Sequence, residues 1–237
     1  MNGDSNAVDW ENIFRALEVW RTETLRHGNT FPADSIDTAV TGIAHQYSRD
    51  PWAVLVSTIL SLRTKDEVTR VSSRQVLDTC PTPAKLLKLP VEEIARLAYP
   101  AGFYRTKAAN LKNIAAILME QYDGQVPPDM DTLLALPGVG RKTANLVLSE
   151  AFDIDAICVD IHVHRISNRA GWLGPEGTRG PEQTEMTLRE ILPKRYWKRI
   201  NSLLVFYGQR VCRPVSPYCS RCVIGGHCRR RGVERTR

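Results

Sequence analysis

Apolar residues recur along this chain with the period of an amphipathic α-helix, and this repeat restricts the possible folds more than any other feature. Residues 10–17, 111–118 and 144–151 each place apolar side chains at positions i, i+3, i+4 and i+7. Residues 52–62 are mostly apolar over a length that suits a buried helix better than a strand. Asp155–Val159 is the only short segment with strand-like alternation. The sequence therefore predicts an all-α protein of about ten helices with short, Pro- and Gly-containing connections.

The composition adds a mild electrostatic bias. The 237 residues carry a formal net charge of +6 at pH 7. Such an excess favours a polyanionic partner, although many enzymes that bind no polyanion have a similar charge. No stretch is long and apolar enough to cross a membrane, and the chain does not open with a basic segment followed by an apolar run. We therefore expect a cytoplasmic protein, nucleoid-associated if bacterial, with no membrane partner. The basic residues 229–237 are expected to be mobile.

Four of the six cysteines gather near the end of the sequence, whereas Cys80 and Cys158 are isolated. The cluster has the spacing C-x6-C-x2-C-x5-C and consists of Cys212, Cys219, Cys222 and Cys228. Because disulfides are rare in a reducing compartment, such a cluster indicates a metal site. Zinc sites usually use two separated C-x-x-C pairs, and only one pair is present here, so the spacing favours a cubane iron–sulfur cluster over zinc. A coordinatively filled cluster would be structural.

The segment Leu133–Leu148 reads LLALPGVGRKTANLVL and has the pattern of a helix–hairpin–helix. A short helix is expected to end at Leu136, since Pro137 disfavours helix at the residue before it. Gly138 and Gly140 permit backbone angles closed to other residues, and a second helix is expected to start near Arg141. Backbone N–H groups of the turn and of the helix N-terminus can bind a phosphate. The alternative is a structural turn with its basic residues in solvent.

Lys142 lies in the first turn of the second expected helix. The helix dipole disfavours a cation there, and burial would add to this effect. Both influences lower the pKa of the amine and leave more of it neutral and nucleophilic. The alternative is a solvated lysine that binds phosphate.

Asp160 stands in the sequence CVDIHVHR, after a short apolar run and before an expected helix. Its simplest role is an N-cap, and backbone N–H bonds would keep its carboxylate ionised. An ionised carboxylate can also stabilise positive charge that develops on a sugar at C1′. The two roles are compatible. For His164 we expect a structural role, while His162 could support Asp160, contact phosphate or be structural.

Taken together, LPGVGRKTA, VDIHVHR and the four-cysteine tail resemble the endonuclease III family of helix–hairpin–helix DNA glycosylases. Weaker similarity runs through DPWAVLVSTILSLRTKD, GFYRTKAANL and DGQVPPDMDTLLALPG, so the resemblance covers roughly residues 50–228. It implies a six-helix barrel domain with the helix–hairpin–helix at residues 45–153. It also implies a second domain of residues 1–44 and 154–237 that holds a [4Fe-4S] cluster on the four cysteines, with DNA bound between the domains.

The resemblance also implies a function. Lys142 matches the nucleophilic lysine of the family and Asp160 its catalytic aspartate, so the chain is expected to be a bifunctional DNA glycosylase and AP lyase. Its expected substrate is double-stranded DNA with oxidised or otherwise damaged pyrimidines, or with abasic sites, and it is expected to act as a monomer. The residues expected to contact DNA are Gly138, Val139, Gly140, Arg141, Thr143, His162, Arg63, Phe103 and Lys107.

Two positions depart from the family pattern. The family commonly has Gln where this chain has Arg63, and Leu where it has Phe103. In the family these side chains fill the gap left by the flipped base and wedge the duplex. Arg can donate two hydrogen bonds to guanine, and Phe can stack between base steps. Our hypothesis is that the two changes alter the preference for the opposite base or the range of lesions; the alternative is that both are merely tolerated.

Two other functions remain open at this stage. One is a glycosylase for mismatched uracil or thymine, suggested by Arg63 and Phe103. The other is an iron–sulfur DNA-binding module without catalysis, which the presence of both Lys142 and Asp160 disfavours.

Overall fold

The computed structural model describes residues 8–27 and 38–237, and all its regular structure is helical. The described residues contain no strand, so the strand-like alternation of Asp155–Val159 was misleading: this segment is an extended connection between helices. By their internal contacts, residues 32–156 form one compact unit, and residues 1–31 together with 157–237 form another. This division falls at 31/32 and 156/157, whereas the boundaries expected from the sequence are 44/45 and 153/154. Within the described ranges, none of the helices has the length and apolar character needed to span a membrane.

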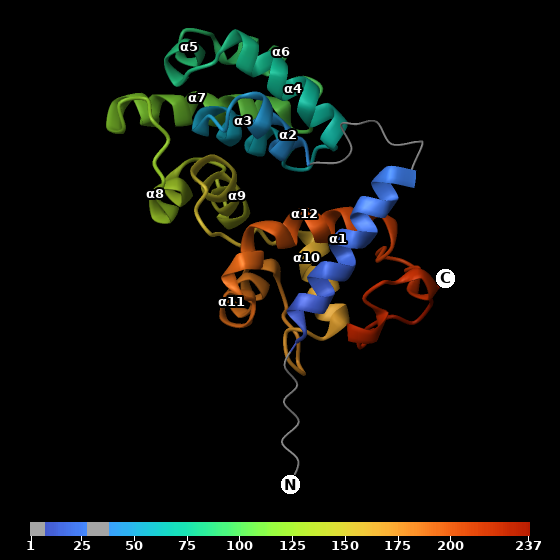
Figure 1. The fold of residues 1–237 in the computed structure, drawn as a ribbon. Helices are drawn as coiled ribbons and strands as arrows, with labels where there is room; N and C mark the ends of the chain where they lie inside the picture. Colours follow the sequence, from blue (N-terminus) through green and yellow to red (C-terminus); the bar gives the residue numbers. More distant parts are fainter. Residues whose placement is uncertain (1–7, 28–37) are drawn as a thin grey trace. The chain divides into compact units, whose positions relative to one another are not determined.

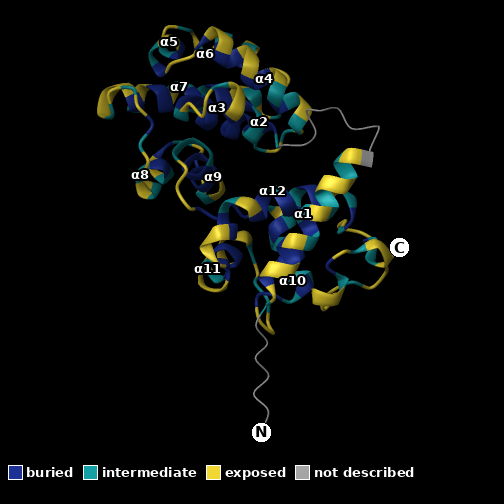
Figure 2. Ribbon diagram, in the orientation of Figure 1, coloured by how far each residue is buried: buried dark blue, intermediate teal, exposed yellow. Residues whose placement is uncertain are grey.

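The unit of residues 32–156 is built around one buried helix, α3 (Pro51–Ser61). Asp50 caps α3 by accepting the Ala53 N–H at 2.8 Å, and Pro51 occupies its first turn, as expected for a helix start. Every residue from Trp52 to Leu60 is buried, which confirms the helix expected there (Figure 2). The helix packs against α2 (Ala39–Gln46), α4 (Asp66–Thr79), α7 (Tyr104–Gln121) and α9 (Arg141–Phe152). Three further helices complete the unit: α5 (Pro83–Leu87), α6 (Val91–Ala98) and α8 (Met130–Ala135) (Figure 1).

The other unit joins α1 (Trp10–His27) to the C-terminal third of the chain. The apolar stripe of α1 is buried against α12 (Trp197–Arg210), and the Phe14 ring stacks on Tyr196 with centroids 4.0 Å apart. The helix α10 (Ile161–Ala170) packs between α12 and α11 (Pro181–Ile191). In the described part of this unit, three short 3₁₀ turns follow or link these helices: η2 (Lys194–Tyr196), η3 (Cys219–Arg221) and η4 (Gly225–His227).

The basic C-terminal residues are held in place, contrary to the expectation that they are mobile. The Arg237 N–H donates to the Pro217 carbonyl at 2.9 Å, and its own carbonyl accepts from Ser220. The N–H of Arg229 donates to the carbonyl of Ala170 at 3.1 Å. Composition does not predict backbone hydrogen bonds of this kind, so the basic character of the segment was not a sufficient basis for expecting mobility.

Candidate functional site

The expected hairpin is present between α8 and α9. Gly138 has φ +77°, and a Cβ there would run into the Asn110 amide, so this position needs glycine. Gly140 is different, because its φ of −100° is open to any residue and a Cβ would meet nothing within 4 Å. The expectation that both glycines supply unusual backbone angles is therefore wrong for Gly140. Its missing side chain instead leaves the start of α9 open to close approach by a ligand.

The first turn of α9 combines buried and exposed residues. Gly140 is the N-cap residue, and no side chain caps the helix in the part of the chain that the structure describes. Thr143 is 1% exposed, so only its backbone, not its side chain, could face a phosphate. Val139 is also buried, and its N–H donates to the Leu136 carbonyl at 3.1 Å. Since the first N–H groups of a helix lack partners within the helix, this open N-terminus suits an anion.

Lys142 is exposed on the same turn. The burial considered from the sequence is therefore not present at this side chain.

Asp160 caps α10 as the sequence predicted. Its Oδ1 accepts the N–H groups of His162 and Val163 at 2.8 and 2.9 Å. Both bonds are accepted by Oδ1, and together they fix the orientation of the carboxylate. Oδ2 is therefore the oxygen that the cap leaves available to a substrate.

The two neighbouring histidines have different surroundings. His162 Nδ1 lies 2.9 Å from Nη2 of Arg165. Since a guanidinium can only donate, Nδ1 accepts, and Nε2 carries the proton of the neutral ring. His164 Nδ1 lies 2.7 Å from the Thr184 hydroxyl, and burial lowers its pKa, which fits the structural role expected for it. Arg165, which the sequence did not single out, thus orients His162.

Arg63 and Phe103 are neighbours although they come from different loops. The Arg63 guanidinium carbon lies 5.7 Å from the centre of the Phe103 ring. Both side chains are exposed, Phe103 to 64%. Both residues have left-handed backbone angles, with φ 52° and 56°. Sequence reasoning named both positions but had no signal that they stand side by side.

Lys107 corrects a prediction. It was expected to contact DNA, but it is 5% exposed, and its ammonium donates to the carbonyls of Leu60 and Leu62 and to the Thr64 hydroxyl. An ammonium has three donors, and all three are used. Burial lowers the pKa of Lys107 to about 8. Its role is therefore inside the protein, beneath the loop that carries Arg63.

The four clustered cysteines lie in the C-terminal loop and are free thiols. Three of the sulfurs are close to donors: Cys222 Sγ accepts the Tyr207 hydroxyl at 3.2 Å, Cys228 Sγ the Arg230 N–H at 3.4 Å, and Cys212 Sγ lies 3.6 Å from Arg169 Nη1. Burial raises the pKa of both the Cys222 and the Cys228 thiol. In the described ranges, no three His, Cys, Asp or Glu side chains are grouped to hold one metal ion.

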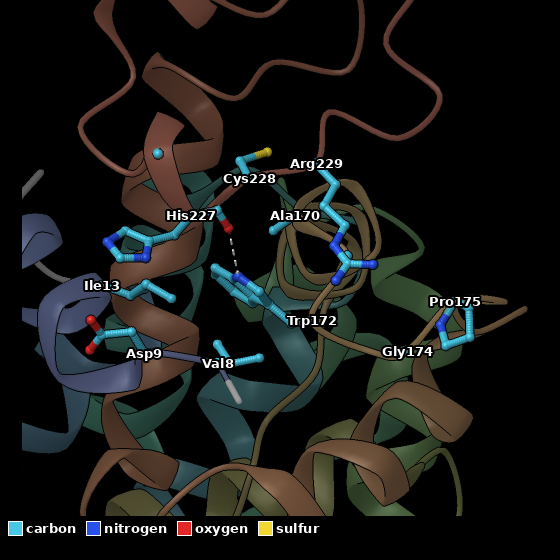
Figure 3. A pocket seen from close by; sticks show the side chains of 12 residues that line it. Val8, Asp9, Ile13, Ala170, Trp172, Gly174, Pro175, His227, Cys228 and Arg229 are labelled. Carbon is cyan, nitrogen blue, oxygen red and sulfur yellow. Dashed lines mark hydrogen bonds between the residues drawn. The ribbon is translucent and has the colours of Figure 1, made fainter. Parts of the chain in front are cut away.

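A pocket of about 470 Å³ lies beside this loop (Figure 3). The Trp172 indole N–H crosses part of it to donate to the His227 carbonyl at 3.3 Å. Its lining contains neither Lys142 nor Asp160, so it is separate from the predicted reactive groups. The side chains around it include Val8, Asp9, Ile13, Trp172, His227 and Arg229.

Comparison with known proteins gives consistent results. Residues 56–194 match the model of the HhH-GPD superfamily of base excision DNA repair proteins. Endonuclease III of Thermotoga maritima is 46% identical over 79% of this chain and 88% of its own length. A solved structure of endonuclease III trapped as a covalent intermediate with DNA matches with a TM-score of 0.71 and 34% identity, over 81% of this chain and 93% of that one. A thermostable thymine-DNA glycosylase has a TM-score of 0.72 at 24% identity, over 92% and 97% of the two chains, and shows the shared fold alone.

Proposed function

Because this chain belongs to the endonuclease III family of base excision DNA repair proteins, a family of bifunctional DNA glycosylases and AP lyases, we propose that Lys142 is its nucleophile and Asp160 its catalytic carboxylate. The observation that carries this proposal is the pair of helix starts: an exposed lysine on the uncapped first turn of α9, and a carboxylate fixed by its own cap on α10. The substrate is duplex DNA that contains a damaged pyrimidine or an abasic site, and the enzyme acts as a monomer in the cytoplasm.

The two groups divide the chemistry. The damaged nucleotide leaves the base stack, and the neutral Lys142 amine attacks C1′. The bond from C1′ to the base breaks, and the base departs with the bonding electrons and takes up a proton. Asp160 offsets the positive charge that forms on the sugar as this bond breaks. Opening of the sugar ring gives a Schiff base between Lys142 and C1′. Loss of a C2′ proton then expels the 3′ phosphate by β-elimination, which cuts the strand 3′ to the lesion.

The hairpin supplies the main DNA contact outside the reaction centre. Gly138 shapes the turn, and Gly140 leaves room for a phosphate oxygen to reach the N–H groups of Arg141 and Thr143. Such a contact positions DNA without reading its sequence. Phosphate contacts displace counterions, so binding weakens as salt increases.

The C-terminal cysteines are suited to a [4Fe-4S] cluster. Such a cluster takes four thiolates as ligands. Hydrogen-bond donors lie close to three of the four cysteine sulfurs, and donors of this kind also support a bound cluster. The sequence has one C-x-x-C pair with the other two cysteines close by, and this spacing suits a four-iron centre better than zinc. When bound, the cluster supplies structural cross-linking of this loop. Iron and sulfide analysis of purified protein tests the assignment, and stoichiometric zinc would refute it.

Borohydride trapping on abasic-site DNA tests the central assignment. The wild type should form a covalent adduct, and Lys142→Ala should form none. Lys88→Ala is a matched control, since Lys88 is an exposed lysine of the same unit and should trap like the wild type. An adduct of undiminished yield in Lys142→Ala, or none in the wild type, would show that the lyase assignment is wrong.

Arg63 and Phe103 are the residues that we expect to determine which lesion and which opposite base the enzyme selects. Their exposure and mutual contact suit insertion into the space that a flipped base vacates, with Arg63 able to donate to guanine on the opposite strand. The same observation favours a second candidate, a glycosylase for uracil or thymine mismatched with guanine. Excision rates for a damaged pyrimidine, uracil and thymine opposite each of the four bases separate the two. Rates that depend neither on the opposite base nor on Arg63→Gln would contradict any role of Arg63 in selection.

A further inference from the structure

Two exposed residues of this protein share an uncommon backbone conformation and touch each other. Arg63 and Phe103 both have positive φ, and neither is the glycine that such angles favour. Non-glycine residues persist in this region only where their surroundings determine the conformation, and such strain concentrates at functional sites. We therefore looked for the contacts that hold Arg63 and Phe103 at positive φ.

The first of these contacts is the buried ammonium of Lys107. It donates to Leu60 O at 2.8 Å, to Leu62 O at 2.6 Å and to Thr64 Oγ1 at 2.8 Å. Leu60 and Leu62 lie at the C-terminal end of α3, where carbonyls have no partner within the helix and a cation is favoured. One side chain of α7 thus fixes the segment on both sides of Arg63.

The second contact joins the two loops directly. The Gly102 N–H donates to Thr64 Oγ1 at 3.1 Å, so one hydroxyl bonds both the Lys107 ammonium and the loop that carries Phe103. A Cβ on Gly102 would lie 2.7 Å from the Arg63 carbonyl oxygen, closer than real Cβ atoms come to backbone. The approach of the loops therefore requires glycine at this position.

We propose that Lys107, Thr64 and Gly102 are positioning residues that clamp two loops into one preformed wedge, with Arg63 and Phe103 as its tip. The proposal rests on the proposed function, since it assumes that the tip enters DNA. The physical advantage is preorganisation. Because the two loops are already ordered in the folded protein, binding to DNA does not carry the entropic cost of ordering them. Arg63 and Phe103 are then already side by side when they reach the duplex.

The clamp should act on base extrusion and much less on bond breaking at the sugar. A duplex with a damaged base has stacking to lose before the nucleotide can leave, whereas an abasic site has no base to unstack. A loosened wedge should therefore slow excision of a damaged base more than cleavage at a preformed abasic site. General instability would instead reduce both activities in parallel.

The test compares these two substrates under single-turnover conditions. Thr64→Val removes the hydroxyl that joins the loops while keeping the shape of the side chain, and Thr64→Ser restores a hydroxyl. We expect Thr64→Val and Lys107→Met to slow excision about tenfold, which is about 1.4 kcal/mol of barrier, and to change abasic-site cleavage by less than about twofold. Thr64→Ser should recover most of the excision rate.

The chain provides a matched control for the buried lysine. Lys112, on the same helix α7, donates to the carbonyls of Leu87 and Leu89, both at 2.5 Å, and neither of these bonds reaches a loop of the wedge. Lys112→Met should keep the ratio of excision to cleavage at the wild-type value. If Lys107→Met does not fold, the Thr64→Val and Thr64→Ser pair decides the question alone.

Two results would overturn the clamp. One is a parallel loss of excision and cleavage in Thr64→Val; the other is an equal change in Lys112→Met and Lys107→Met. Failure of the proposed function looks different, because the wild type would then form no borohydride adduct on abasic-site DNA. Normal excision by Arg63→Ala and Phe103→Ala, in a protein that still traps, would reject the wedge itself.

Discussion

Burial of the Lys107 ammonium predicts an unusual alkaline rise in the stability of this protein. Burial lowers the pKa of this side chain from 10.5 to about 8 in the folded state. Below pH 8 the lysine is charged in both the folded and the unfolded protein. Between pH 8 and pH 10.5 the unfolded protein binds the additional proton, so the free energy of unfolding rises with pH. Above pH 10.5 both forms are neutral and the rise ends.

The size of the effect follows from the two pKa values. A fall from 10.5 to about 8 corresponds to roughly 3 kcal/mol of stability gained across this interval, to order of magnitude. The side chain is only 5% exposed, so solvent screens this term little. Lys107→Met has no ammonium and should lack this rise. The unfolding free energy of the wild type minus that of Lys107→Met should therefore increase by roughly 3 kcal/mol between pH 8 and pH 10.5.

Urea denaturation of both proteins from pH 7 to pH 10.5 measures this difference, because ionisations common to both proteins cancel in it. Lys112→Met provides the reference for removing a lysine from α7. The other charged groups on the segments around Lys107 are largely exposed or half-buried and are retained in both proteins: Arg63, Lys65, Asp66, Glu92, Glu93, Arg96 and Arg105. A wild-type minus Lys107→Met difference that stays flat from pH 7.5 to pH 10.5 would show that the ammonium is not buried as the structure has it.

Three further changes test the site. Asp160→Asn should leave the urea midpoint nearly unchanged, because Asn caps helices about as well as Asp; excision should fall about 100-fold with loss of the charge, and an unaffected rate would limit Asp160 to capping. Gly138→Ala should destabilise the protein by about 1–3 kcal/mol in urea unfolding, since φ is positive and Asn110 occupies the space of the new methyl; a neutral result would contradict the hairpin geometry. Tyr207→Phe removes the donor to Cys222 and should cost about 1–2 kcal/mol. Iron-release kinetics should accelerate with it, and an unchanged rate would argue that this hydroxyl does not support the cluster loop.

Features set by neighbouring residues were predictable from the sequence. The starts of α9 and α10 were expected near Arg141 and after Asp160, and both are confirmed. Proline, glycine and a capping carboxylate act on the backbone within a few residues, so a linear pattern contains nearly all the information. The buried helix α3 was predictable for the same reason, because a continuous apolar run of that length has few alternatives to burial.

Features set by distant residues were not predictable. The groups that bind the Lys107 ammonium lie 43 to 47 positions earlier in the chain. Lysine is almost always solvated, so a basic residue beside family DNA contacts was reasonably expected to reach DNA. Burial of the Thr143 side chain and pairing of Arg237 with Pro217 depend in the same way on contacts that no local pattern encodes. Positive φ at Arg63 and Phe103 had no sequence signal, because neither is a residue type that favours such angles.

The helix α3 contacts both the proposed clamp and the helix that carries the proposed nucleophile. Its C-terminal end holds the loop with Arg63 through Lys107, and its side packs against α9, whose first turn bears Lys142. Close-packed interiors transmit displacement instead of absorbing it. A core substitution in α3 should therefore disturb excision and lyase cleavage together, whereas breaking the clamp should disturb excision alone. Observing that contrast would identify α3 as a support shared by both activities, and the proposed clamp as an element that affects excision alone.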